Sequence, residues 1–304
     1  MYPGRWKAAD SFMRTEESRL FIRSYFEGSP CGNAPEFIRL NGLAGFPNVN
    51  RELFKQERFF YSILKKRLFE LYAALKRHFP AINFIHYKGI YMNEFYPEGN
   101  MRVFSDIDLL LRRKDFRYLS RFFRREDNSL AVTSGDLSIE LKNDFFDPFF
   151  TRYISGKQGR FLKDVYAKAL YHDPRCHFIL LCMHNFAHQF SRLDRFFDLH
   201  FLISSHELKI SSILSLAREY DLGVFVKFNV RLMAVLGFPG TEDVLLNPLY
   251  DHLLKKLYDS GRNRFKIMLL LFVLPLPLSI VFLLEKILFL DVEFLKYKLK
   301  KSRL

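Results

Sequence analysis

Residues 87–113, YKGIYMNEFYPEGNMRVFSDIDLLLRR, decide the fold because they end in an apolar run that carries two aspartates one residue apart. The run VFSDIDLLL predicts a strand over residues 103–111. Strand side chains alternate between two faces, so Asp106 and Asp108 are expected on the same face. Two carboxylates at that spacing repel each other unless a cation lies between them. The stretch therefore predicts a strand with a cation-binding face.

Short elements surround this strand. AINFIHY, residues 81–87, is rich in strand-forming residues, and Gly89 follows where that strand must turn into a short helix over residues 90–96. PEGN, residues 97–100, predicts a turn. Residues 115–125 predict a helix with its apolar residues on one face. This alternation of elements indicates a small α/β unit.

A hairpin is predicted over residues 129–144, with its turn at residues 134–136. Its second strand, residues 137–141, carries a third acid, Glu140, between two apolar residues. Alone, such an acid can simply face solvent. Together with an aspartate pair on a neighbouring strand, it completes an arrangement that holds two divalent cations for phosphoryl transfer. Oxygen ligands of this kind favour Mg²⁺.

Helical spacing dominates the rest of the chain. The longest pattern repeats apolar residues every three or four positions, at Phe60, Leu64, Leu68, Leu71 and Leu75, and Pro80 ends it. We therefore predict an N-terminal helical segment over residues 1–80, the small α/β unit over residues 81–150, and a C-terminal helical region over residues 151–304.

The 304-residue chain carries a net charge of +14, and this charge attracts polyanions such as nucleic acid or anionic lipid. Residues 255–304 contain 11 basic and four acidic residues, which is half of the excess. Within them, residues 267–284 are uncharged and close to spanning length, but Pro275 and Pro277 break their middle. Two readings stay open, a pair of short buried helices or an interfacial membrane anchor with basic flanks at residues 262–304.

The three cysteines, Cys31, Cys176 and Cys182, form no CxxC pair and are too few for a disulfide framework. They are typical of a reducing compartment. The first residues contain no apolar segment of the kind that a signal peptide has. We therefore expect a cytoplasmic protein, with peripheral membrane contact through the basic tail as an alternative.

Other polar groups are interpreted as structural. His184 and His188 lie one helical turn apart, but the stretch HNFAH lacks the glutamate of a metalloprotease, so we expect core or hydrogen-bonding histidines. A position near a nucleotide pocket is the alternative. A helix-surface ion-pair set is predicted from Arg192, Arg195 and Asp198. A basic stripe, either solvated or in contact with phosphate, is predicted from Arg117, Arg121 and Arg124.

Several of these motifs carry a resemblance to a known family. The Lys-Gly pair at 88–89, the Tyr-Pro pair at 96–97, the run SDIDLLL at 105–111 and the run IEL at 139–141 resemble the uncharacterised nucleotidyltransferase family of the DNA polymerase β-like superfamily. Residues 180–203 resemble the helical region of that family. The resemblance covers residues 50–205.

The resemblance implies an α+β fold, in which a small mixed sheet forms a polymerase-β-like palm between helical segments. It implies that Asp106, Asp108 and Glu140 bind two Mg²⁺ ions and form the catalytic set. The residues that it places around the nucleoside triphosphate are Lys88, Gly89, Arg102 and Ser105. Two departures stand out, because Ile90 supplies no hydroxyl after the motif glycine and Lys142 stands where relatives tend to have histidine.

The function that follows is a metal-dependent nucleotidyltransferase. It would move a nucleoside monophosphate from a nucleoside triphosphate to the hydroxyl of an acceptor and release pyrophosphate. Transfer RNA or another RNA, a small molecule and a protein all remain open as the acceptor. The alternative from another class is a non-catalytic basic protein, associated with membrane or RNA, that keeps the palm only as a scaffold.

Overall fold

The computed structural model describes residues 15–86, 88–104, 106–126, 129–134, 137–143, 156–187, 190 and 192–241. Its sheet has five strands in the order β1-β2-β5-β4-β3. The strands are β1 (Ile85–His86), β2 (Asp106–Leu110), β3 (Arg124–Glu126), β4 (Ser129–Ser134) and β5 (Leu137–Lys142). β2 and β5 run parallel, and the other neighbours are antiparallel. The small mixed sheet expected from the sequence is therefore confirmed.

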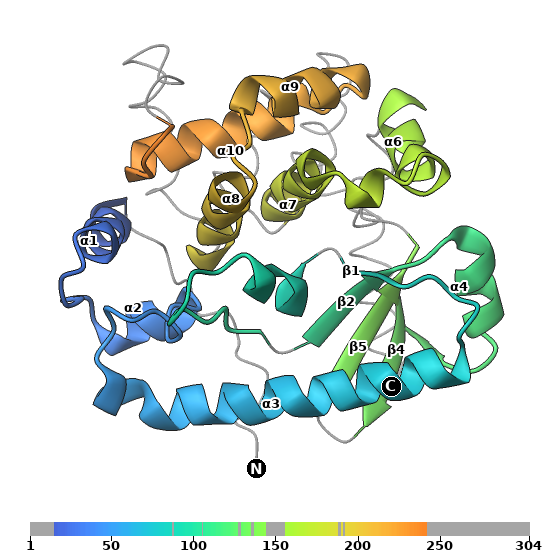
Figure 1. Ribbon diagram of the computed structural model, residues 1–304, viewed down its shortest axis with the longest axis horizontal. Coiled ribbons are helices and arrows are strands. Elements are labelled where there is room, and N and C mark those ends of the chain that lie inside the picture. The colour runs from blue at the N-terminus through green and yellow to red at the C-terminus, as the bar shows by residue number, and fades with distance from the viewer. Residues whose placement is uncertain are drawn as a thin grey trace, which may run out of the picture.

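Helices precede and follow the sheet (Figure 1). Before it come α1 (Thr15–Phe26), α2 (Pro35–Leu40) and α3 (Arg51–His78), and the short 3₁₀ helix η1 (Gly89–Glu94) connects β1 with β2. α4 (Arg113–Leu119) follows β2. The C-terminal half contains α6 (Gly156–Ala167), the 3₁₀ helix η2 (Leu170–His172), α7 (Pro174–Ala187), α8 (Asp194–Ser205), α9 (Ile210–Glu219) and α10 (Gly223–Leu236).

One face of the sheet packs on α3 and α4. Leu64, Leu68 and Leu75 of α3 are buried in one cluster with Ile107 and Leu109 of β2. The predicted apolar spacing of α3 is thus the face that covers the sheet, and the helix ends before Pro80 as expected. Phe60 differs from this expectation, since it is exposed.

The opposite face of the sheet is turned toward the C-terminal helices, and Figure 1 shows α7 and α8 on the side of the sheet away from α3. Leu110 of β2 and Ile85 of β1 share a buried cluster with residues of α7 and α8. Leu110 lies two and four residues after Asp108 and Asp106, so the alternation of the strand puts both aspartates on this same face. The carboxylates therefore lie between the sheet and the helical layer.

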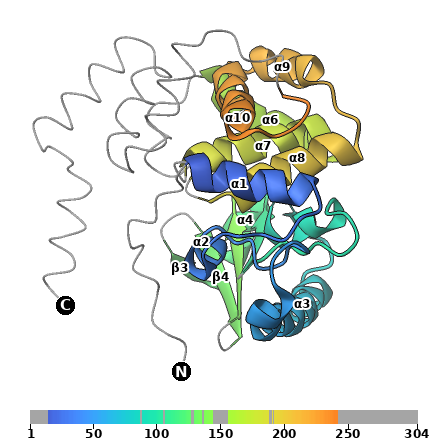
Figure 2. The same cartoon turned by 90° about the vertical axis from the view of Figure 1, so that its left-hand side faces the viewer.

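The N-terminal and C-terminal helices pack together, as the side view in Figure 2 shows for α1 and α8. Phe197 of α8 makes an edge contact with Phe21 of α1 at 5.9 Å between ring centroids, and it lies 4.5 Å from the ring of Phe46. Aromatic rings at these separations stabilise the contact beyond the area they bury. The chain has 35 phenylalanines, and this cluster accounts for some of them.

Of two local expectations, one is confirmed and one differs from the structure. The short helix expected after Gly89 is present, as the 3₁₀ helix over Gly89–Glu94. The helix predicted over residues 115–125 ends at Leu119, because the chain then enters β3, where Arg124 pairs with Ala131 of β4. The predicted basic stripe on one helix is therefore wrong: Arg117 lies on α4 and Arg124 on a strand.

Some expectations concern residues outside the described ranges, namely Ser105, His188, the hairpin turn at residues 135–136 and the basic tail at residues 262–304 with its apolar segment 267–284. In the part of the chain that the structure describes, no helix has the length and apolar character needed to cross a bilayer. The three cysteines are free, and two of them are buried. The division of the chain at residues 80 and 150 stays a prediction.

Candidate active site

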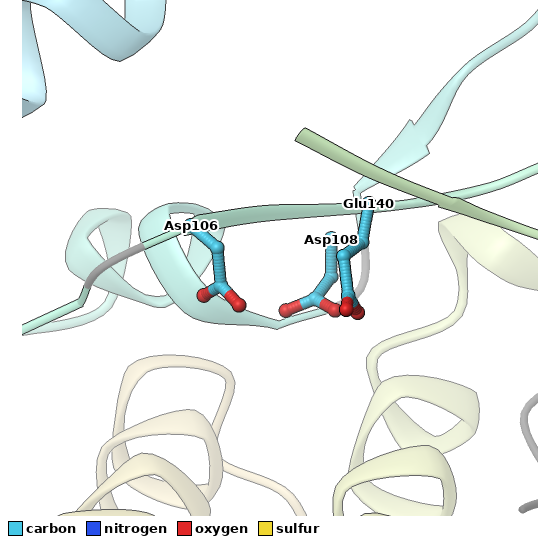
Figure 3. Close-up of side chains that lie close together, drawn as sticks. All are labelled: Asp106, Asp108 and Glu140. Carbon is cyan, nitrogen blue, oxygen red and sulfur yellow. The ribbon is translucent and has the colours of Figure 1, made fainter. Parts of the chain in front are cut away.

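Two parallel strands bring the three predicted carboxylates together. In the β2–β5 ladder, Asp108 lies opposite Glu140 and Asp106 lies opposite Ser138. One carboxylate oxygen of each acid lies within 4.8 Å of the others. Figure 3 shows the three side chains pointing to the same side of the strands. A one-residue slip of the ladder would send the Glu140 side chain to the opposite face, so this register creates the cluster.

Two lysines contact the cluster. The Lys88 ammonium lies 2.8 Å from Asp108 Oδ1, and the Lys142 ammonium lies 3.4 Å from the same oxygen. Lys142 also forms an ion pair with Glu140 Oε2. The Asp108 side chain is only 2% exposed, and a carboxylate buried to this degree needs such partners to stay charged. The site thus contains three negative and two positive side chains.

Burial and charge act differently on the two aspartates. Burial, and then repulsion from Asp108, raises the pKa of Asp106 from 3.8 to about 6. Burial would also raise the pKa of Asp108, but the lysine charges outweigh it and lower that pKa. Burial lowers the pKa of Lys88 despite the attraction of Asp108. Two neighbouring aspartates, one with a raised pKa and one with a lowered pKa, are typical of functional sites.

Gly89 lets the chain pass close to the carboxylates. Its φ of +65° lies in the left-handed region that favours glycine. A Cβ atom built on it would lie 3.4 Å from the Asp106 carbonyl oxygen and 3.8 Å from Asp108 Oδ2. These are ordinary van der Waals distances, so the backbone conformation, and not a lack of space, favours glycine beside the cluster.

The donor set fits a hard divalent cation. Three carboxylate oxygens within 4.8 Å of one another converge on a space that a cation could share. Mg²⁺ prefers oxygen ligands and keeps several waters, so a site with two partly exposed acids suits it. These are Asp106 and Glu140, and the Glu140 side chain is 32% exposed.

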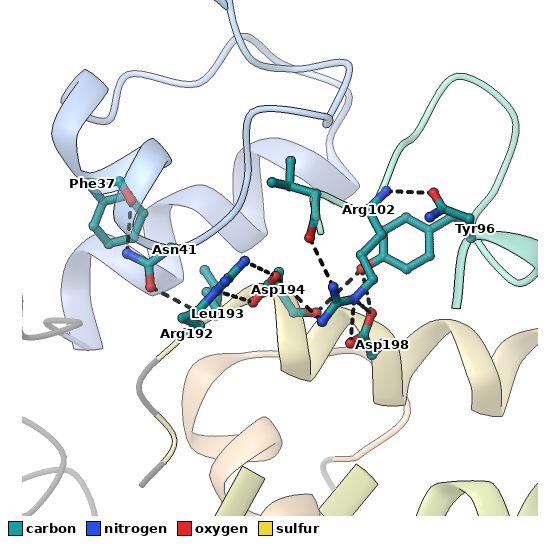
Figure 4. A network of polar contacts seen from close by, with 10 residues as sticks. Phe37, Asn41, Tyr96, Arg102, Arg192, Leu193, Asp194 and Asp198 are labelled. Carbon is teal, nitrogen blue, oxygen red and sulfur yellow. Dashed lines mark hydrogen bonds and ion pairs between the residues drawn. The ribbon is translucent and has the colours of Figure 1, made fainter. Parts of the chain in front are cut away.

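Arg102 lies in a separate, buried network (Figure 4). Its Nε atom donates to both carboxylate oxygens of Asp198 on α8, each at 2.8 Å, and Tyr96 Oη donates to Asp198 Oδ1 at 2.8 Å. The Arg102 side chain is 9% exposed and that of Asp198 1%. The Arg102 guanidinium therefore binds α8, and this contact holds the segment before β2 against the C-terminal helices.

The network continues to α2. Arg192 Nη2 pairs with Asp194 Oδ2 at 2.6 Å, and Asn41 Oδ1 accepts a hydrogen bond from the Leu193 amide at 3.2 Å. Gly42 leaves room for this contact, because a Cβ there would come within 2.2 Å of Arg192 Nη2. The predicted helix-surface ion-pair set of Arg192, Arg195 and Asp198 is therefore wrong. Asp198 is buried against Arg102, and Arg192, which precedes α8, pairs with Asp194, the first residue of α8.

Sequence reasoning did not assign Lys142 to the site, although the signal was present. In β5, Glu140 and Lys142 are two residues apart, and the strand alternates buried and half-buried residues. The rule that put Asp106 beside Asp108 also puts Lys142 beside Glu140. His184 lies half-buried on α7 and its role stays a prediction.

Comparison with known proteins adds one finding. A family described as uncharacterised nucleotidyltransferase matches residues 40–237. This stretch contains the sheet, both lysines, the three carboxylates and the network around Asp198. The chain belongs to this family. Membership supports a general role in nucleotidyl transfer. No curated protein and no solved structure matches the chain.

Proposed function

We propose that the chain is a metal-dependent nucleotidyltransferase that moves a nucleoside monophosphate from a nucleoside triphosphate to an acceptor hydroxyl. The observation that carries the proposal is the cluster of Asp106, Asp108 and Glu140 on adjacent parallel strands, in a member of a nucleotidyltransferase family. The mixed sheet with its acids on the face toward the C-terminal helices is consistent with a palm of the polymerase-β type.

In this reaction the acceptor oxygen attacks the α-phosphorus of the triphosphate, and the bond to the β-phosphate oxygen breaks, so pyrophosphate leaves. Two Mg²⁺ ions, when bound, would lower the acceptor's pKa and stabilise the leaving charge. Asp106 and Asp108 would hold them together with Glu140. The open position of Glu140 suits it to receive the acceptor proton on a carboxylate oxygen.

Lys88 and Gly89 are proposed to face the triphosphate. The Lys88 ammonium already balances Asp108 at 2.8 Å and would contribute positive charge beside the phosphates. Gly89 has the positive φ that the chain adopts beside the carboxylates. Arg102 is assigned a positioning role instead, because its guanidinium is occupied by Asp198. Ser105 stays a prediction.

The acceptor class is suggested only by charge. A net charge of +14 favours a polyanion such as transfer RNA or another RNA over a neutral small molecule. A protein acceptor is the alternative that experiment distinguishes. We also propose a cytoplasmic location, with contact of residues 262–304 to anionic membrane as the alternative.

One observation favours a second candidate, a non-catalytic scaffold. Lys88 and Lys142 satisfy Asp108 and Glu140 without any metal, as they would in a fold that has lost its chemistry. Nucleotide binding separates the two functions. A catalytic site binds a triphosphate more tightly with Mg²⁺ than with chelator, whereas a scaffold binds it equally under both conditions.

The direct test is transfer of label. The protein is incubated with each α-labelled triphosphate and cell extract, with Mg²⁺ or with chelator, beside the Asp108→Asn variant. We expect a labelled acceptor only with the unaltered chain and Mg²⁺. Equal labelling by Asp108→Asn would contradict the assignment of the cluster.

A further inference from the structure

The contacts of the two lysines divide the carboxylate cluster into two halves. Asp108 Oδ1 is shared by Lys88 and Lys142, and Lys142 also takes Glu140 Oε2. Asp108 Oδ2 instead lies on the side of Gly89, 3.8 Å from the position of a Cβ there. The Lys142 ammonium therefore bridges Asp108 and Glu140, which form one half of the cluster, and Asp106 forms the other half together with Asp108.

The charges make the same division. The three carboxylates carry three negative charges and the two lysines carry two positive charges, so the described cluster has a net charge of one negative unit. A single divalent cation reverses that charge. A second one must enter a region that is already positive, and it must displace the lysine from its two carboxylates. A triphosphate removes this obstacle, because it brings negative charge together with its own cation.

Lys142 is better suited to move than Lys88. It is the last residue of β5, and its side chain is 24% exposed whereas that of Lys88 is 11% exposed. Its contact with Asp108 is longer than that of Lys88, 3.4 Å against 2.8 Å, although its contact with Glu140 is short. A lysine has a flexible stem and a compact charge, so it can exchange carboxylates for phosphate oxygens by rotating its side chain.

We propose that Lys142 is an internal counter-cation that occupies the Asp108–Glu140 half of the site until a metal–nucleotide complex displaces it. The inference rests on the proposed function and adds a mode of regulation to it. Without nucleotide, the chain binds one divalent cation at the Asp106 half. When a nucleoside triphosphate arrives with the second cation, the Lys142 ammonium leaves Asp108 and Glu140 and binds the phosphates. The complete site thus forms only around a nucleotide.

The proposal predicts a metal stoichiometry that depends on Lys142. Free Mn²⁺ is measured by electron paramagnetic resonance during titration of the full chain, with and without a non-hydrolysable triphosphate analogue. We expect the unaltered chain to bind one ion without the analogue and two with it. Lys142→Met should bind two ions without the analogue, the second about tenfold more tightly than in the unaltered chain, since one opposing charge is gone. It should also bind the analogue about tenfold more weakly, since a phosphate partner is gone.

Two further variants control the experiment. Lys168→Met removes a lysine that is ion-paired at 2.9 Å with Asp164 outside the cluster, and it should behave as the unaltered chain. Lys142→Arg keeps the charge and should keep the stoichiometry of one ion, which separates loss of charge from loss of structure if Lys142→Met is poorly folded.

The outcomes are distinguishable. Two ions bound to the unaltered chain without analogue, or identical titrations of Lys142→Met and the unaltered chain, would overturn the role of Lys142 and leave the proposed function intact. No Mn²⁺ binding by any variant, with or without analogue, would overturn both. One ion without analogue, two with it, and two for Lys142→Met alone would support the inference.

Discussion

The two aspartates of β2 should respond to the same substitution with opposite changes in stability. Asp106 has a pKa raised from 3.8 to about 6 by burial and by repulsion from Asp108. A carboxyl with a raised pKa in the folded state opposes folding wherever it is ionised. This cost is complete above pH 6 and disappears as the pH falls below 4. Asp106→Asn removes the charge and therefore the cost.

The magnitude follows from the pKa. A change of about two pKa units corresponds to about 3 kcal/mol, and partial exposure of the side chain reduces this, so we expect Asp106→Asn to stabilise the metal-free protein by about 1–3 kcal/mol at pH 7. Asp108 has a lowered pKa because the two lysines outweigh its burial. Asp108→Asn leaves the Lys88 ammonium with a weaker partner in a buried place and should destabilise the protein by about 3 kcal/mol.

The assay is chemical unfolding at pH 7 in the presence of chelator, with the free energy of unfolding compared among the unaltered chain and the two variants. Repeating it at pH 4 provides the control, because Asp106 is then protonated and Asp106→Asn should lose its advantage. If Asp106→Asn is as destabilising as Asp108→Asn, or if its effect is the same at both pH values, the electrostatic account of the site is wrong.

Three other predictions follow, two from the structure and one from the sequence of residues 262–304. Mn²⁺ affinity should fall as the pH drops below about 6, since a proton then competes for Asp106. Titrations in the absence of nucleotide at several pH values check this, and an affinity that stays constant between pH 7 and pH 5 would contradict it. Asp198→Ala should cost about 3 kcal/mol, because it leaves the buried Arg102 guanidinium with only its longer carboxylate contact, to Asp194 at 3.8 Å. Unfolding measurements should show Lys157→Ala, in an ion pair with 60% and 48% exposed side chains, to be nearly neutral, and an equally small effect of Asp198→Ala would refute a structural role for the network. The full chain should float with anionic vesicles, and deletion of residues 262–304 should abolish this flotation. If apolar insertion holds the protein on the vesicle, the flotation of the full chain resists high salt. If the deletion instead removes a salt-sensitive retention of transfer RNA, the partner of these residues is a nucleic acid.

Much of the site could be read from local sequence because strand alternation is a local property. Asp106, Asp108 and Glu140 were identified in this way, and the structure brings them together. Local alternation could not reveal the network around Asp198, because Arg102 and Asp198 are 96 residues apart in the sequence. Only the packing of α8 on the sheet makes them neighbours. The early end of α4 had the same kind of cause, because pairing of β3 with β4 competes for the residues that helical spacing predicts.

By itself, the sequence determined which residues alternate on a strand, which spacing makes the covering face of α3, and which acids are candidates for a cation. Tertiary structure decided the register that sets Asp108 against Glu140, the face of the sheet that meets the C-terminal helices, and the lysines that neutralise the acids. The physical reason is the range of the forces involved. Periodicity acts within a few residues of the chain, whereas register and ion pairing depend on contacts between segments that only the folded core holds in place.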